Sequence, residues 1–379
     1  MASSEVLPPL IAAQLNHLIV HSPFPVKVEK LWSGSKKRNL LDRFTLLIPF
    51  CLDHIRWDVI YNVSAPMAAP DVIFGPDDDT FSAFLMEPDR RGNNKLAMSS
   101  LVDWNYRESF RLLNLILELR EQYAAYQRKR VGEVEDERIK FEISTISHRG
   151  GIEMLVTGVE KPEEVKFGVP LLAVNINEMV PGCPWRLQQK IQLQVVFPVV
   201  KNFALSTNPS APRLKLVSSA DLRALLSVED VKLPPWSSGM CMAEYLPDLE
   251  DTLGKQVVEC ISAIDVRRRF IEALAVVFGR PLEADSVFCR RSSFLATSGV
   301  FTFLVHISLP TQFPRQQPSI MLQSAQHFNS QGSPIKSTPL PDYPWSPRWE
   351  ASQMAERIFE YLVEECLNFK KYCNEMQQY

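Results

Sequence analysis

The sequence has 379 residues, 46% of them hydrophobic, which is enough for two or three domains with separate cores. Its 41 lysines and arginines nearly cancel 44 aspartates and glutamates, so the net charge is −3 and no broad basic field favours direct nucleic-acid or anionic-membrane binding. Only 14 glycines, against 28 prolines, also argue against the loops that hold nucleotide phosphates.

The first predicted elements are an amphipathic helix at residues 9–20 and two strands in a short antiparallel meander. Alternating apolar residues place these strands in HIRWDVIYNV and DVIFG, with a proline-containing connection between them. After Trp104 the apolar spacing predicts a helix with a stripe at Phe110, Leu113 and Leu117. The helical pattern continues to about Lys140, as one long helix or as two helices end to end.

The same order of elements occurs twice more. The second copy has strands in KIQLQVVFPVV and RLKLVSS, then Trp236 before a helical stretch that ends near residue 264. The third has a helix at 264–279, strands in VFTFLVHISLP and SIMLQSAQHF, then Trp345 before a last helix striped with Met354, Ile358 and Leu362. Ser346 and Pro347 are predicted to start that helix, as N-cap and first residue.

This repeat predicts the fold class and the domain organisation. A helix, an antiparallel meander and a closing helix, repeated three times, make the class α+β. The predicted domains are residues 1–131, 132–262 and 263–379.

The seven cysteines form no C-x-x-C pair, which indicates neither a disulfide framework nor a zinc ribbon. The first residues lack the basic start of a secretory or transit peptide, and no apolar run approaches the roughly 20 residues of a membrane span. His17 and His21 are four residues apart, which is half of a zinc site on a helix, but no third ligand is evident. We therefore expect reduced thiols, no metal or other cofactor, no membrane, and a location in cytoplasm and nucleus.

The third repeat resembles the ubiquitin-conjugating-enzyme fold, and in particular its inactive variants, the UEV and RWD domains. It has a proline-rich turn, FPRQQP, then His327-Phe328-Asn329 where active enzymes have H-P-N, and Trp345-Ser346-Pro347 as W-S-P. The family's usual spacing, counted forward from the histidine or back from the tryptophan, places the nucleophile at Ser337. Because a hydroxyl lacks the reactivity of a thiolate, this resemblance implies that the fold is catalytically dead and the chain is not an enzyme.

The whole chain is similar to the brain and reproductive organ-expressed (BRE) family, with FPRQQPSIMLQSAQHF and PDYPWSPRW near the C-terminus and DRFTLLIPF in the first repeat. The similarity is weaker across residues 140–230. It implies a scaffold of the BRISC deubiquitinase, which cleaves lysine-63-linked polyubiquitin, and of a related nuclear complex in DNA repair. The implied partners are a JAMM-type zinc deubiquitinase, an Abraxas-type scaffold and a von Willebrand-type adaptor, and direct contact with ubiquitin is left open.

A partner-binding surface is predicted in the segment PLPDYPWSPRW, which combines prolines with residue types that are common in binding hot spots. The candidate residues are Tyr343, Trp345, Arg348 and Trp349. The alternative is that Trp345 and Trp349 seal the last helix against the sheet. Two other functions also stay open: a divergent conjugating enzyme with a displaced nucleophile such as Cys241, and an RWD-type adaptor in an unrelated pathway.

Overall fold

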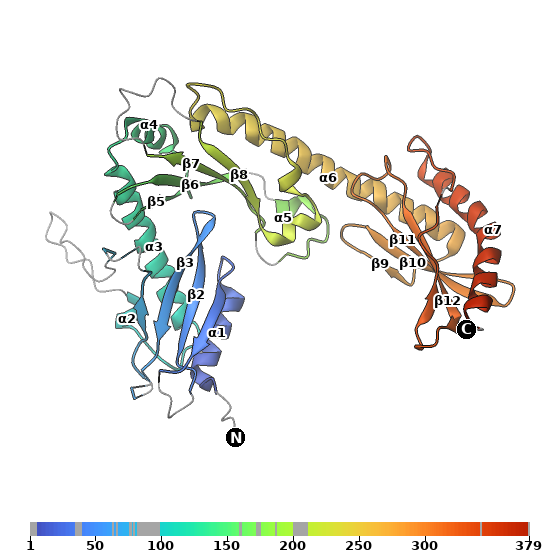
Figure 1. Cartoon of the computed structure of the whole chain (residues 1–379), viewed down its shortest axis with the longest axis horizontal. Coiled ribbons are helices and arrows are strands. Elements are labelled where there is room, and N and C mark those ends of the chain that lie inside the picture. The colour runs from blue at the N-terminus through green and yellow to red at the C-terminus, as the bar shows by residue number, and fades with distance from the viewer. Residues whose placement is uncertain are drawn as a thin grey trace. The chain divides into compact units, whose positions relative to one another are not determined.

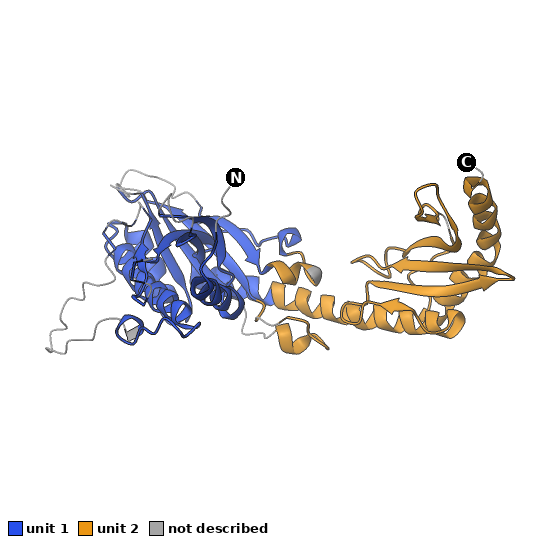
Figure 2. Cartoon of the chain, turned by 90° about the horizontal axis from the view of Figure 1, so that it is seen from below, with its two compact units in different colours: residues 1–173, 190–219, 228–251 blue, residues 174–189, 220–227, 252–379 orange. Residues whose placement is uncertain are grey.

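The computed structural model describes residues 6–34, 40–62, 64–65, 67–75, 78, 80–81, 99–158, 161–171, 176–185, 188–199, 211–341 and 343–377. The chain forms two compact units (Figure 2). Unit 1 comprises residues 1–173, 190–219 and 228–251, and unit 2 comprises residues 174–189, 220–227 and 252–379. Within the described ranges, no helix has both the length and the apolar composition for crossing a bilayer.

The first sheet of unit 1 is a four-stranded antiparallel meander in the order β1-β2-β3-β4 (Figure 1). Its strands are β1 (Lys27–Trp32), β2 (Arg43–Phe50), β3 (Asp53–Ile60) and β4 (Asp71–Ile73). The flanking helices are α1 (Pro9–His21), α2 (Ser99–Val102) and α3 (Arg111–Gly132). Helices α1 and α3 contact each other and share one core with the sheet, in which Trp57 is fully buried.

The second sheet of unit 1 has the order β5-β6-β7-β8 and is also antiparallel. Its strands are β5 (Glu153–Thr157), β6 (Glu164–Leu171), β7 (Ile191–Pro198) and β8 (Arg213–Ser218). The smaller elements nearby in sequence are α4 (Glu137–Ile146), α5 (Ile176–Met179), η3 (Ala220–Ala224) and η4 (Val228–Asp230). The helical pattern up to residue 140 is thus two helices, because the Asp136 side chain accepts hydrogen bonds from the Arg138 and Ile139 N–H groups and starts α4 afresh.

Helix α3 buries a wider face than the sequence stripe predicted. Leu112, Ile116 and Leu119 are fully buried, whereas Phe110 lies just before the helix and is 40% exposed. Helix α3 packs on the first sheet and also contacts β5 of the second sheet, so it is covered on two sides. A single apolar stripe, which is typical of a helix with one buried face, therefore does not describe it.

The two sheets of unit 1 meet at the turn between β2 and β3. Cys51 and Leu52 form this turn with positive φ angles of 50° and 64°. The Cys51 N–H donates to Glu153 Oε2 at 2.5 Å, and Arg120 bridges the Pro49 carbonyl and the same carboxylate. At Gly168 of β6, a Cβ would lie 3.2 Å from Cys51 Cα, so a side chain there would push the turn away.

Helix α6 (Met242–Phe278) is one continuous helix of 37 residues that begins in unit 1 and continues in unit 2. The prediction of separate helices on either side of residue 264 is therefore wrong. Leu246, Leu249 and Leu253 start a buried row that continues through Val257 and Ile264, so no break in the apolar spacing ends the helix. The predicted domain boundary at 262/263 falls inside α6; the three-domain division stays a prediction.

Unit 2 holds the third sheet, a five-stranded antiparallel meander in the order β13-β12-β11-β10-β9. Its strands are β9 (Glu283–Ala284), β10 (Arg291–Ser298), β11 (Phe301–Ser308), β12 (Ser319–Phe328) and β13 (Pro334–Lys336). One face is covered by α6, where Phe278 meets Phe294, and by α7 (Ala351–Gln377), where Phe369 meets Phe303. Antiparallel sheets with packed helices confirm the predicted α+β class.

The start of α7 differs from the prediction. Ser346 and Pro347 lie in a turn in which the Trp349 N–H donates to the Ser346 carbonyl at 3.2 Å. The first helical bond joins the Met354 N–H to the Glu350 carbonyl, so the helix begins at Ala351. The serine and proline therefore make a turn before the helix and do not cap it.

Candidate functional site

Ser337, the residue at the expected nucleophile position, follows β13 directly. Its Oγ accepts a hydrogen bond from the Leu322 N–H at 3.0 Å and donates one to the Thr338 carbonyl at 2.7 Å. Its own N–H donates to the Leu322 carbonyl at 2.8 Å. The hydroxyl thus links β12 to the segment after β13, and both of its hydrogen-bonding functions serve the main chain.

His327, Phe328 and Asn329 form the end of β12 and the turn into β13. His327 Nδ1 lies 2.9 Å from Ser324 Oγ, and its Nε2 lies 3.2 Å from Asn374 Oδ1 on α7. Asn329 Oδ1 accepts hydrogen bonds from the Gln331 and Ser333 N–H groups at 3.0 and 2.9 Å. These contacts give the tripeptide a structural role, because each polar side chain in it closes the hairpin or ties it to α7.

The predicted partner-binding residues divide into buried and exposed ones. Tyr343 is 3% exposed and donates to the Pro318 carbonyl, and its ring meets Trp345. Trp345 is half-buried, and its indole N–H donates to the Pro314 carbonyl at 3.0 Å. Arg348 is exposed and Trp349 is half-buried. Tyr343 and Trp345 therefore support the fold through their contacts, which leaves Arg348 and Trp349 as the more accessible pair; the binding role of all four stays a prediction.

All seven cysteines are unpaired, and five of them are buried. Cys241 is 7% exposed at the start of α6, where its N–H donates to Glu244 Oε2 at 3.2 Å. Burial raises the pKa of the Cys51, Cys260 and Cys289 thiols, and it raises the pKa of Cys373 to about 11. These four thiols are in the wrong state for nucleophilic attack at neutral pH, since a reactive cysteine needs a lowered pKa.

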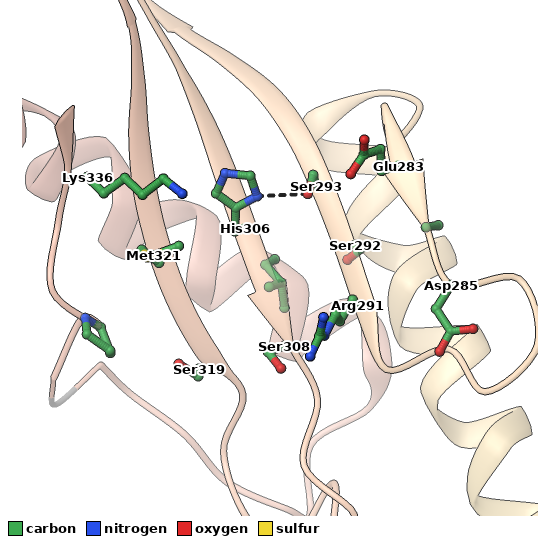
Figure 3. Close-up of a pocket in the computed structure, with 13 residues that line it drawn as sticks. Glu283, Asp285, Arg291, Ser292, Ser293, His306, Ser308, Ser319, Met321 and Lys336 are labelled. Atoms are coloured by element: carbon green, nitrogen blue, oxygen red, sulfur yellow. Dashed lines mark hydrogen bonds between the residues drawn. The ribbon is translucent and has the colours of Figure 1, made fainter. Parts of the chain in front are cut away.

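The outer face of the third sheet carries a pocket of about 640 Å³ (Figure 3). His306 lies at its centre, with Nδ1 2.8 Å from Ser293 Oγ and Nε2 3.2 Å from Gln323 Oε1. Arg291 and Lys336 also line the pocket. In a catalytic serine–histidine pair, a carboxylate orients the histidine, whereas here the neutral Gln323 amide takes that place. The hydrogen bonds of His306 therefore link the three neighbouring strands β10, β11 and β12.

His17 and His21 lie on one face of α1 with their rings stacked at a centroid distance of 4.0 Å. His21 Nδ1 is 3.1 Å from the His17 carbonyl oxygen. Among the described residues, no group of three or more histidine, cysteine, aspartate or glutamate side chains could hold a metal ion. The pair is thus a two-ligand arrangement without a third protein ligand in the described ranges.

Comparison with known proteins extends the resemblance over most of the chain. The family model for brain and reproductive organ-expressed protein (BRE) matches residues 4–328, including the stretch from 140 to 230 where the similarity is weak. A protein named "BRISC and BRCA1-A complex member 2" from Danio rerio is 30% identical over 337 residues, which cover 84% of this chain and 81% of that protein. A protein of the same name from Branchiostoma floridae is 25% identical over 354 residues, covering 87% and 84%. The chain belongs to the brain and reproductive organ-expressed protein (BRE) family.

Proposed function

We propose that this protein is a non-catalytic scaffold subunit of a deubiquitinase complex. Two relatives that align over most of the chain are named as members of the BRISC and BRCA1-A complexes. The single observation that carries the non-catalytic part is the Ser337 hydroxyl, which stands at the expected nucleophile position and is held by the Leu322 N–H and the Thr338 carbonyl. A scaffold needs surfaces and stability but no nucleophile, and this arrangement provides stability.

The architecture in this proposal is three tandem UEV/RWD-like domains at residues 1–131, 132–262 and 263–379. It is supported by three antiparallel meanders, each followed by a helix with a tryptophan shortly before it. Trp104 precedes α3, Trp236 precedes α6 and Trp345 precedes α7. Duplication explains this order because the strands and helices of a repeated domain keep their order while its loops vary in length.

The partners in this proposal are a JAMM-type zinc deubiquitinase, an Abraxas-type scaffold and a von Willebrand-type adaptor. The complex would cleave lysine-63-linked polyubiquitin and act in the DNA damage response, in both cytoplasm and nucleus. Since the net charge of −3 provides no basic field, any contact with chromatin would go through these partners.

Co-purification from cells tests the scaffold role. The tagged chain should recover a zinc-dependent activity that cleaves lysine-63-linked chains, and Arg348→Ala with Trp349→Ala should lose one co-purifying subunit if the PLPDYPWSPRW segment is a docking surface. Arg357→Ala is the matched control, because Arg357 is 57% exposed and pairs with Glu360 on the same helix. Recovery of other proteins without any deubiquitinase would favour the adaptor of an unrelated pathway, whereas an unaffected double variant would contradict only the docking surface.

A thioester assay tests the absence of catalysis. The wild-type chain and Ser337→Cys, mixed with charged activating enzyme, should both give no reducible ubiquitin adduct. The reason is that a thiol at residue 337 would sit against the main chain of β12, where the hydroxyl now bridges two main-chain groups. Ser333→Cys, in an exposed position of the same hairpin, reports non-specific adducts. A reducible adduct on any wild-type cysteine would refute the non-catalytic proposal, whereas an adduct on Ser337→Cys above that background would contradict only the expectation that a thiol at residue 337 is held against the main chain.

A further inference from the structure

Helix α7 has two apolar faces, and among the described residues the second is covered only in part, where Phe359 meets Phe278 of α6. The buried face packs on the third sheet and consists of Met354, Ala355, Ile358, Leu362, Cys366, Phe369 and Cys373. A second row, formed by Phe359, Val363 and Leu367, is 40%, 54% and 55% exposed. Three large apolar side chains in one continuous row on a helix indicate a surface that another helix covers.

The row is flanked by two opposite charges at equal distances from its centre. Glu356 lies three residues before Phe359, and Lys370 lies three residues after Leu367, while Val363 is four residues from each apolar neighbour. Residues three and four apart share a helix face, so all five side chains lie along one line. In the part of the chain that the structure describes, neither Glu356 nor Lys370 forms an ion pair. Glu356 is exposed and Lys370 is half-buried.

We propose that this row, from Glu356 to Lys370, is a homodimer interface in which α7 pairs antiparallel with α7 of a second copy of the chain. A two-fold axis at Val363 places Phe359 against Leu367 of the second copy and Glu356 against Lys370 of the second copy. The same contacts recur on the other side of the axis, as an isologous interface requires. A parallel pairing would instead set Glu356 against Glu356, which like-charge repulsion disfavours.

The charge arrangement favours a second copy over an unrelated helix. An unrelated partner needs basic residues opposite Glu356 and an acid opposite Lys370, and a second copy of this helix supplies both at the right spacing. The apolar surface also continues on Phe278 of α6, whose ring centroid lies 5.4 Å from that of Phe359. Because about four helical turns are buried, the dimer is weak, with a dissociation constant on the order of tens of micromolar.

Sedimentation velocity of the purified full-length chain over a range of concentrations tests this interface. The wild type should shift from monomer to dimer as its concentration passes the dissociation constant. Val363→Asp should stay monomeric, because two carboxylates would face each other at the axis. Glu356→Lys and Lys370→Glu should each raise the dissociation constant by at least about tenfold, since each places two like charges together at both ends.

The charge swap is the decisive variant. Glu356→Lys combined with Lys370→Glu restores opposite charges across the two-fold axis, so its dissociation constant should return to within about threefold of the wild type. Glu375→Lys changes an exposed acid of the same helix outside the row and should leave dimerisation unchanged. Thermal melts followed by circular dichroism show that each variant is folded, which is expected because the changed side chains are not part of the core.

Two results would overturn the proposal. A wild type that remains monomeric well above the expected dissociation constant would show that the row is not a homodimer interface. A dimer that the single charge reversals weaken and the double variant does not restore would place its interface elsewhere. Neither readout depends on the deubiquitinase role, so failure here and failure of the proposed function are distinguishable.

Discussion

Replacing Trp345 by alanine should lower the free energy of unfolding of unit 2 by about 3–5 kcal/mol, the usual range for truncating a large packed aromatic side chain. The Trp345 ring contacts Phe270 of α6 at a centroid distance of 6.0 Å and Phe313 at 5.6 Å. Its indole N–H donates to the Pro314 carbonyl. Alanine would leave a cavity between α6 and the turn before β12 and would remove the donor of that carbonyl.

Hydrogen exchange read by mass spectrometry measures this loss locally, on peptides from β12 and α7, alongside urea unfolding. Trp345→Phe keeps most of the packing and loses the hydrogen bond, so it should cost only about 1–2 kcal/mol. Trp349→Ala is the matched control, since Trp349 is a half-buried tryptophan of the same segment. If Trp345→Ala left exchange unchanged but abolished co-purification of a partner, the residue would be a binding residue and the packing role would be wrong.

Arg120→Ala should destabilise unit 1 by about 2–4 kcal/mol, because it removes one member of a partly buried ion pair that is shared by the two sheets. Arg120 and Glu153 side chains are each 20% exposed. The guanidinium also donates to the Pro49 carbonyl and lies 4.5 Å from the centre of the Phe24 ring. Without it, the Glu153 carboxylate keeps the Cys51 N–H as a partner but loses its counter-charge.

Urea unfolding of Arg120→Ala side by side with Arg56→Ala checks this expectation. Arg56→Ala is the control, because Arg56 pairs with Glu29 at 3.2 Å while 67% exposed, and such a surface pair should contribute less than about 1 kcal/mol. Glu153→Gln keeps an acceptor for the Cys51 N–H and should fall between the two. Equal losses for Arg120→Ala and Arg56→Ala would show that the contact between the sheets does not depend on this ion pair.

The third meander could be predicted from the sequence because its local signals agree with its environment. In β11, Phe301, Phe303 and Val305 are buried and the residues between them are partly exposed, so strict alternation revealed the strand. The run SIMLQSAQHF coincides with β12. The location of Ser337 beside this sheet also followed from spacing, and the family resemblance is confirmed across most of the chain.

The rest depended on contacts between residues far apart in the sequence. Strands β5 and β6 alternate in burial, but their placement beside the first sheet depends on α3 and on the Cys51 turn, which lies more than 100 residues from Glu153 in the sequence. The hydrogen bonds of Ser337 could not be predicted, because they depend on the register between β12 and the segment after β13. The second apolar row of α7 was visible in the sequence at three- and four-residue spacing. The buried row on the same helix is longer, so the sequence pattern predicted that row alone.

The continuity of α6 has a practical consequence for cutting this protein into pieces. One of the boundaries between the two units lies between residues 251 and 252, inside that helix, so no fragment can end in a natural loop there. A fragment beginning at Thr252 would expose unpaired N–H groups that Asp248 and its neighbours now satisfy through the helix, and its first turns would fray. Expression trials of a C-terminal piece should therefore retain the whole span from Cys241 to Phe278.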